Sequence, residues 1–425
     1  MPAMRTHVDF RLPDFLEALH PDLLVRYLER FQEEYESTQR QARSKQVDEA
    51  LAQLATGDFA GACGILGQLP RTAPVLARLL EGPLKCVNDF DCPRGRASLQ
   101  RAIAADGVDI PADTDPVTAG MRLMLDYPDH FGEALAICHV EQTQDWRLHR
   151  GPEPSPVKVT KKAARALAGD FGEMLKESGL TGRCIAQVFE QEERTIIELS
   201  HEQYVEALRQ FRGRDIEINW TRPVRHARLV YRPSTGLLKV RVYRNDEQLI
   251  GTLLLAVGAR LFGWEGHFLG DGRKLHLDLS CLSTEPRTVT DPVDRIEGVE
   301  VVCLEFARAG DADAVARFHG SGTEHLYRLV RDFCPISRRV QVRHAALQFK
   351  FPGPRNTGRR TVWLTEPNST NLGDDDYDRV IEKYLIRWGM LDGPEPPDAD
   401  FEPDRRARAA SLDMARPGSL FAGGH

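Results

Sequence analysis

The first 150 residues carry apolar side chains at the spacing of amphipathic helices. After Pro21, apolar positions recur at three- and four-residue steps, at Leu23, Leu24, Tyr27, Leu28, Phe31 and Tyr35. That stripe is what a helix buries against a core. Glycine and proline then divide the segment into shorter helical stretches, the last of them near 129–137. The pattern predicts an all-helical domain over residues 1–150, a usual domain size.

A different pattern follows a proline-rich stretch. GPEPSP opens a segment at 151–157 whose prolines cannot continue a helix, so we interpret it as a linker. A helix is expected over 158–178, after which the apolar period changes to alternation. Strands are predicted at 184–189, 195–199, 215–220, 274–279 and 298–306, with a short helix at 202–211. The predicted fold class is α+β, with this second domain spanning 158–391.

Two segments of the second domain resemble each other. The first begins VRHARLVYRPSTGLLKVRVYR at residue 224 and the second VRHAALQFKFPGPRNTGRRTVWL at residue 342. Both predict a β-hairpin followed by an amphipathic helix that ends on an aromatic residue and glycine. This order predicts an internal ββα duplication, although hairpin-plus-helix units also recur without common descent. Residues 392–425 are rich in Pro, Gly, Arg and Asp and predict a disordered tail.

Charge is segregated along the chain. The protein has a net charge of −7, yet residues 218–245 and 333–365 each contain seven Arg or Lys and no carboxylate. A basic face on an acidic protein favours contact with one anionic partner over indiscriminate polyanion binding. Alternation places Arg228 and Arg232 on one face of the first strand, and Lys239 and Arg241 on one face of the return strand. The hairpin is therefore expected to have a mostly cationic side, open to solvent or a ligand, and an apolar side that packs on a core.

These hairpins supply the candidate nucleic-acid-binding residues. Guanidinium and ammonium groups bind backbone phosphate, and an aromatic ring stacks on an exposed base. The candidates for phosphate contact are Arg225, Arg228, Arg232, Lys239, Arg241, Arg343, Arg355, Arg359 and Arg360, with Trp363 as the stacking residue. The same arginines could instead be solvated or pair with the acidic helical domain, and salt response distinguishes these alternatives.

Catalytic motifs are absent from the sequence. It contains no GxxxxGK[ST], GxGxxG, HExxH or GxSxG, so no common nucleotide, zinc-protease or hydrolase site is indicated. The best enzymatic alternative is a divalent-metal site formed by His267, Asp271, His276 and Asp278. Cys86, Cys92, Cys138 and His139 are zinc-ligand types, but the first two lie too far apart for the usual spacing. We interpret those cysteines as helix-packing residues.

The expected function is therefore a non-catalytic nucleic-acid-binding or accessory subunit, in nucleic-acid maintenance or anti-phage defence. It would belong to a multi-protein assembly and need neither cofactor nor metal. The alternative is an assembly or regulatory protein that docks on an acidic protein partner. Eight cysteines without CxxC spacing fit a reducing compartment. With no leader or membrane-spanning run apparent, we expect a bacterial, cytoplasmic location, with the bacterial origin inferred from the high Arg and Ala content.

Overall fold

The computed structural model describes residues 10–39, 44–143, 145–152, 154–157, 159–191, 193–212, 215–270, 277–308, 311–333, 340–352, 358–373 and 375–393. The fold is α+β, as predicted. Contacts divide the chain into two units, each built from two separated stretches. Unit 1 comprises 1–277 and 362–375, and unit 2 comprises 278–361 and 376–425.

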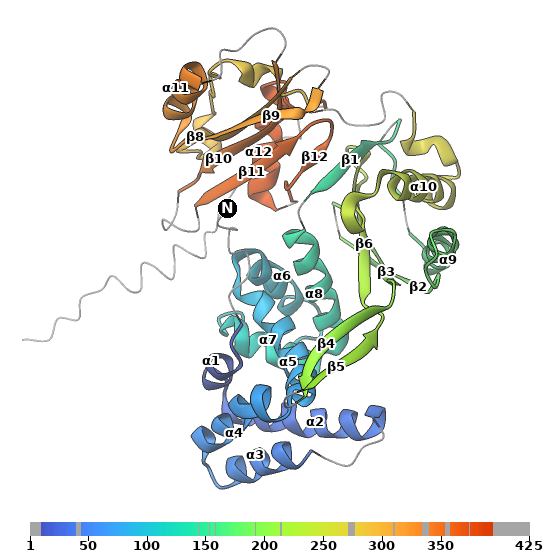
Figure 1. Ribbon diagram of the computed structural model, residues 1–425, viewed down its shortest axis with the longest axis vertical. Coiled ribbons are helices and arrows are strands. Elements are labelled where there is room, and N and C mark those ends of the chain that lie inside the picture. Colours follow the sequence, from blue (N-terminus) through green and yellow to red (C-terminus); the bar gives the residue numbers. More distant parts are fainter. Residues whose placement is uncertain are drawn as a thin grey trace, which may run out of the picture. The chain divides into compact units, whose positions relative to one another are not determined.

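Unit 1 begins with the predicted helices (Figure 1). They are α1 (Leu12–Glu17), α2 (Pro21–Gln39), α3 (Lys45–Ala55), α4 (Phe59–Thr72), α5 (Pro74–Asn88), α6 (Pro93–Ile103), α7 (Pro116–Asp126) and α8 (Pro128–Gln142). Several start on proline, whose missing N–H costs nothing in a first turn. Asp58 and Asp115 cap α4 and α7 by accepting backbone N–H bonds at 2.8 and 2.9 Å. Two clusters of buried apolar side chains form the core.

The rest of unit 1 is an antiparallel sheet with helices on it. Its strands, in sheet order, are β2 (Cys184–Glu190), β3 (Thr195–Glu202), β6 (Val224–Arg232), β7 (Leu237–Arg241), β1 (Trp146–Arg150), β12 (Ser369–Thr370) and the part of β11 (Arg359–Thr365) from Val362 onward. Two helices, α9 (Lys161–Glu177) and α10 (Glu247–Val257), pack on one face around Leu229, Val240 and Phe171 (Figure 1).

A separate two-stranded ribbon interrupts the chain between β3 and β6. It consists of β4 (Glu206–Arg212) and β5 (Asp215–Thr221), which pair antiparallel. The helix predicted at 202–211 is therefore wrong: that stretch is mostly strand. Its apolar residues Val205, Leu208 and Phe211 fall at three-residue steps, a period that suits a helix, but pairing with the strand behind it decides the backbone.

Unit 2 contains three neighbouring antiparallel strands with helices. In sheet order its strands are β10 (Val340–Lys350), β8 (Gly298–Arg308) and β9 (Asp311–His319), and its helices are α11 (Thr323–Phe333) and α12 (Asp376–Arg387). Tyr327 of α11 donates its hydroxyl to Leu282 O at 2.7 Å. On α12, Tyr384 donates to Asp294 Oδ2 at 2.5 Å and Lys383 pairs with the same carboxylate at 3.3 Å.

The structure confirms some of the other sequence predictions and does not confirm the rest. The strands at 184–189, 195–199, 215–220 and 298–306 are confirmed. Of the strand predicted at 274–279, residues 274–276 lie outside the described residues. Its described part, 277–279, is no strand and has a single β-bridge residue, Leu277. The chain has β6, β7 and α10 in one predicted copy and β10, β11 and α12 in the other, so the order agrees. Duplication itself stays a prediction. The tail from residue 394 onward lies outside the described residues.

Candidate nucleic-acid interface

Two basic residues of the first hairpin, Lys239 and Arg232, lie in the interior of unit 1. Lys239 is 1% exposed and Arg232 is 8% exposed. The ammonium of Lys239 donates to Leu372 O at 3.1 Å and to Gly373 O at 2.5 Å. The prediction that this face is open to solvent is wrong here, because the segment after β12 covers it.

The two remaining arginines on that face are also committed to partners within unit 1. Arg228 donates to Glu198 Oε2 at 2.8 Å and to Thr143 Oγ1 at 2.9 Å, at the end of α8. Arg241 donates to Asn245 Oδ1 at 3.1 Å, and its partial burial lowers its pKa. Guanidiniums already bonded in this way hold the fold together and cannot turn toward a phosphate without loss of those bonds.

Arg225 is different because it lies at the N-terminal end of β6. The last pairs of β3 with β6 are His201 with Arg225 and Glu202 with Val224. Directly beyond them, Gln203 N–H donates to Pro223 O at 2.9 Å and closes the base of the β4–β5 ribbon. Arg225 extends its guanidinium over the ring of Tyr243, 5.1 Å from the ring centroid.

A groove of about 370 Å³ opens beside this ribbon base. Its wall comes from the end of α9, the residues after β3, and the start of α10. Tyr204 and Tyr243 provide its aromatic surface, and Arg244 its cation; Glu177 and Asp246 also line it. Tyr204 is 56% exposed. Its hydroxyl donates to Ser178 O, which fixes the ring in place.

The turn at Tyr243–Asn245 presents the cation of the groove. Arg244 and Asn245 both have left-handed backbone angles, with φ of 59° and 48°. Consecutive non-glycine residues in this region are uncommon and are held by their surroundings. Asn245 supplies the restraint, because its Nδ2 donates to Asp145 O at 2.7 Å. The exposed Arg244 places its guanidinium 5.1 Å from the centroid of the Tyr243 ring, as Arg225 also does.

The second hairpin keeps some of its predicted residues on the surface. Arg343 and Arg359 are exposed. Arg360 lies over the Tyr377 ring at 5.1 Å, a cation–π contact within unit 2. Trp363 is partly buried, and its backbone N–H donates to Asn371 Oδ1 at 2.7 Å. Arg355 lies outside the described residues.

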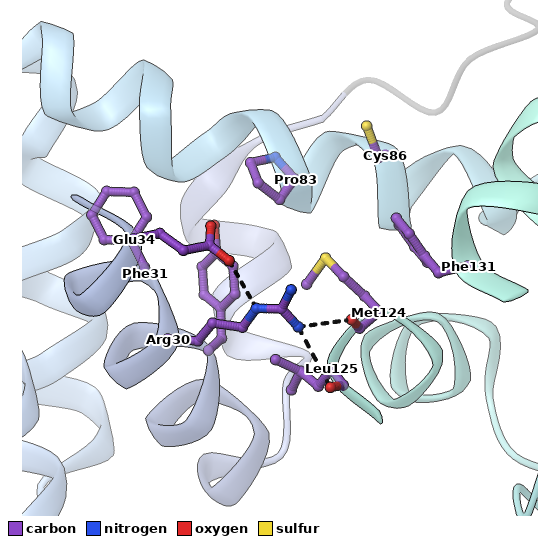
Figure 2. A pocket seen from close by; sticks show the side chains of 9 residues that line it. Arg30, Phe31, Glu34, Pro83, Cys86, Met124, Leu125 and Phe131 are labelled. Carbon is purple, nitrogen blue, oxygen red and sulfur yellow. Dashed lines mark hydrogen bonds and ion pairs between the residues drawn. The ribbon is translucent and has the colours of Figure 1, made fainter. Parts of the chain in front are cut away.

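A second hollow, of about 350 Å³, lies among α2, α5 and α7 (Figure 2). Its polar groups are occupied: Arg30 donates to Glu34 Oε1 at 2.9 Å and to Met124 O at 3.2 Å. Tyr27 donates to Leu80 O at 2.5 Å, and burial raises its pKa. Burial also raises the pKa of the Cys86 thiol. The hollow therefore has the size of a binding site, but neither Tyr27 nor Cys86 is activated by its surroundings.

The predicted metal ligands do not come together in the described structure. His267 is buried, with its ring stacked on Phe262 at a centroid separation of 3.9 Å. Asp278 is exposed, and hydrogen bonds from Ser280 lower its pKa. Asp271 and His276 lie outside the described residues. Within the described residues, no group of three or more His, Cys, Asp or Glu side chains is placed to hold a metal ion.

Three members of the groove, Tyr204, Tyr243 and Arg244, were missed by sequence reasoning. One local signal existed: Arg-Asn-Asp before an apolar run is typical of a turn that enters a helix, with Asp246 as the cap. The sequence gives no sign that this turn lies beside the end of β3, about 40 residues earlier along the chain.

In the part of the chain that the structure describes, no helix is long and apolar enough to cross a bilayer. Comparison of the chain with protein-family models, with curated proteins and with solved structures finds no match in any of the three.

Proposed function

We propose that the protein is a non-catalytic nucleic-acid-binding or accessory subunit of the cytoplasm, and that it holds single-stranded nucleic acid in the groove at the base of the β4–β5 ribbon. The observation that carries this proposal is the grouping of two tyrosine rings with Arg244 in one groove, with a second arginine, Arg225, over the ring of Tyr243. Nonspecific single-strand binders combine stacking platforms with cationic groups that track the phosphates.

The chemistry of the groove supports each part of that role. Tyr204 is exposed and fixed by its hydroxyl, so a base could stack on it with little loss of side-chain entropy. Arg244 is exposed and Arg225 is partly exposed, each beside Tyr243. The charge of Arg244 is exposed to solvent, whereas those of Lys239 and Arg232 are buried. Glu177 and Asp246 also line the groove and would repel phosphate, which restricts where the strand lies.

A second candidate rests on the apolar residues beside the groove. Val205 is 42% exposed and Val224 is 55% exposed, next to Tyr204 and Arg225 in the chain. Tyrosine and arginine around an apolar centre also characterise protein–protein interfaces. Docking on an acidic protein partner is therefore the alternative use of the same surface.

Equilibrium binding of the full-length protein to labelled oligonucleotides of about 16 nucleotides tests the proposal. Single- and double-stranded DNA and RNA are compared at about 50 and 200 mM salt, because phosphate contacts make affinity fall with salt. We expect single strands to bind best. The double variant Arg225→Ala/Arg244→Ala should reduce the slope of log K against log salt by about 0.7 for each phosphate that the variant no longer neutralises.

Two variants of Tyr204 separate stacking from charge. Tyr204→Leu removes the ring and should weaken binding about tenfold or more, with the salt slope unchanged. Tyr204→Phe keeps the ring and should bind close to the parent protein. Arg71→Ala, an exposed residue of α4, changes the net charge without touching the groove and serves as the charge control.

Absence of binding to all four nucleic acids at low salt would refute the proposal and leave the acidic-partner alternative. Equal weakening by Arg71→Ala would assign the binding to overall charge instead of the groove.

A further inference from the structure

Two cysteines from different helices of unit 1 meet at one point. Cys92 lies directly before α6 and Cys138 lies on α8. Gln142 donates from Nε2 to both sulfurs, at 3.2 Å to Cys92 Sγ and 3.1 Å to Cys138 Sγ. The backbone oxygen of Asp89 is within 3.4 and 3.5 Å of the same two sulfurs. Sharing both a donor and an acceptor places the thiols side by side.

The surroundings of Cys92 stabilise a thiolate. Its Sγ caps α6 by accepting the Gly95 N–H bond at 3.2 Å, where the helix dipole favours negative charge. A hydrogen bond with Cys138 is the largest influence, and together with those from Gly95 and Gln142 it outweighs burial and lowers the pKa of Cys92 to about 6.

The partner thiol has the opposite properties. Cys138 is fully buried, and its hydrogen bond to Cys92 raises its pKa, as do burial and the nearby carboxylates of Asp89 and Glu141. The Asp89 carboxylate is itself paired with His139 Nε2 at 3.2 Å. One sulfur is thus partly accessible and anionic, and the other is buried and protonated. A nucleophilic cysteine and a resolving cysteine divide their roles in the same way.

The other described cysteines lack this combination. Burial raises the pKa of Cys63, Cys86, Cys184, Cys281 and Cys303. Cys281 is the informative case, because it is exposed yet has no stabilised thiolate. Reactivity at Cys92 would therefore not follow from exposure alone.

We propose that Cys92 and Cys138 form a peroxide-responsive dithiol pair that closes reversibly into a disulfide between the start of α6 and α8. In the first step the Cys92 thiolate attacks hydrogen peroxide, forming Cys92 sulfenic acid and releasing hydroxide. In the second, Cys138 loses its proton and its sulfur attacks the Cys92 sulfur. The S–S bond forms and the hydroxyl leaves as water. A dithiol reductant restores both thiols by exchange.

Oxidation would also change the helix terminus. As a thiolate, Cys92 accepts bonds from both Gly95 and Gln142. A disulfide sulfur is a much weaker acceptor, so the cap would weaken while a covalent link to α8 replaces it. This site is separate from the groove, and its test does not depend on nucleic-acid binding.

The experiment treats the reduced full-length protein with hydrogen peroxide and analyses it by intact mass and non-reducing peptide mapping. We expect a mass loss of about 2 Da, for two hydrogens, and one linked peptide pair containing Cys92 and Cys138. Dithiothreitol should reverse both. A disulfide joining other cysteines, or no loss of mass, would overturn the proposal.

Variants test the division of roles. In Cys138→Ser, the sulfenic acid at Cys92 has no resolving thiol and should be trapped by dimedone. Cys92→Ser should abolish the mass loss, whereas Cys281→Ser should retain it. Alkylation of the parent protein by iodoacetamide as a function of pH supplies a measurement that needs no substitution. Cys92 should become reactive near pH 6 and Cys281 only in alkaline solution. Equal reactivity of the two at neutral pH would contradict the proposed asymmetry.

Discussion

Individual side chains show where sequence patterning succeeds and where it stops. Alternation correctly separated Leu229 from Arg228 on opposite faces of β6, because side-chain direction in a strand is a local property. It could not tell that the basic face is covered. Lys239 contacts residues 372 and 373, more than 130 positions later, and such a contact leaves no local signature. Of the residues predicted to bind phosphate that the structure describes, Arg225 is the one that contacts a groove residue, Tyr243.

At the same scale, Glu198 should make stability depend on acid pH. Its side chain is 6% exposed; burial alone would raise its pKa, but hydrogen bonds with His226 and Arg228 overcome this and lower it to about 2. Because the pKa of Glu198 is lower in the folded than in the unfolded state, its ionised form stabilises the fold at pH values above the unfolded pKa of ~4.5. This stabilisation is lost as the pH falls toward 2. The full contribution of this carboxylate to the free energy of unfolding is about 3 kcal/mol.

Urea unfolding between pH ~6 and ~3 measures this effect. Glu198→Gln should be less stable than the parent near neutrality, and its stability should fall less steeply with acid. Glu173→Gln is the matched control, because Glu173 is exposed and pairs with Lys176 on the surface of α9. Parallel pH profiles for the parent and Glu198→Gln would contradict the assignment.

Secondary-structure elements were predictable where one period dominated. The helix α2 and the strands β2, β3, β6 and β8 follow from apolar spacing, and glycine and proline mark where the shorter helices after residue 57 divide. The ribbon β4–β5 did not, because its first strand has helical spacing and only pairing with its neighbour identifies it. The groove depends on that ribbon base, so it could not be derived from the sequence either. The strand β12, two residues long, is likewise defined only by its partners.

Lys239 joins two elements and should matter for stability. Its ammonium connects β7 to the chain that follows β12. Lys239→Met keeps most of the volume but leaves those buried carbonyls without this donor. We expect a loss of about 1–3 kcal/mol in the free energy of unfolding, measured by urea denaturation. Lys176→Met, which removes an exposed ammonium from α9, should change it by less than about 0.5 kcal/mol. Similar losses for the two variants would contradict the structural role of Lys239.

At the scale of the whole molecule, the units are not the consecutive domains that composition indicates. The prolines of 151–157 stop a helix, and from them a linker was inferred. Yet Gly151 N–H donates to Gly236 O at 3.0 Å, and the Tyr231 hydroxyl donates to Ser155 O at 2.8 Å. Proline excludes a helix but permits an extended chain to pack on a hairpin. The return of 362–375 to unit 1 is a tertiary event that no local pattern records.

A shortened protein tests whether unit 1 needs that return. A fragment ending at Leu277 retains α1–α10 and loses β12. In the full chain the Leu148 N–H donates to Asn368 O at 3.2 Å, and the fragment lacks this acceptor. Hydrogen exchange at Leu148 should be about tenfold faster or more in the fragment. Amides in the β3–β6 pairing, complete within the fragment, are the control. Equal protection of Leu148 in both proteins would show that unit 1 closes without residues 362–375.

The position of β12 also sets an order of events during synthesis. β1 ends at Arg150 and β12 begins at Ser369, so 218 residues, 151 to 368, must be made between them. At ordinary elongation rates that takes roughly 10–40 s. Throughout this interval one edge of β1 presents unpaired backbone groups, the kind of edge that recruits strands from other chains. A nascent-chain chaperone would be needed most while residues 151–368 are emerging from the ribosome.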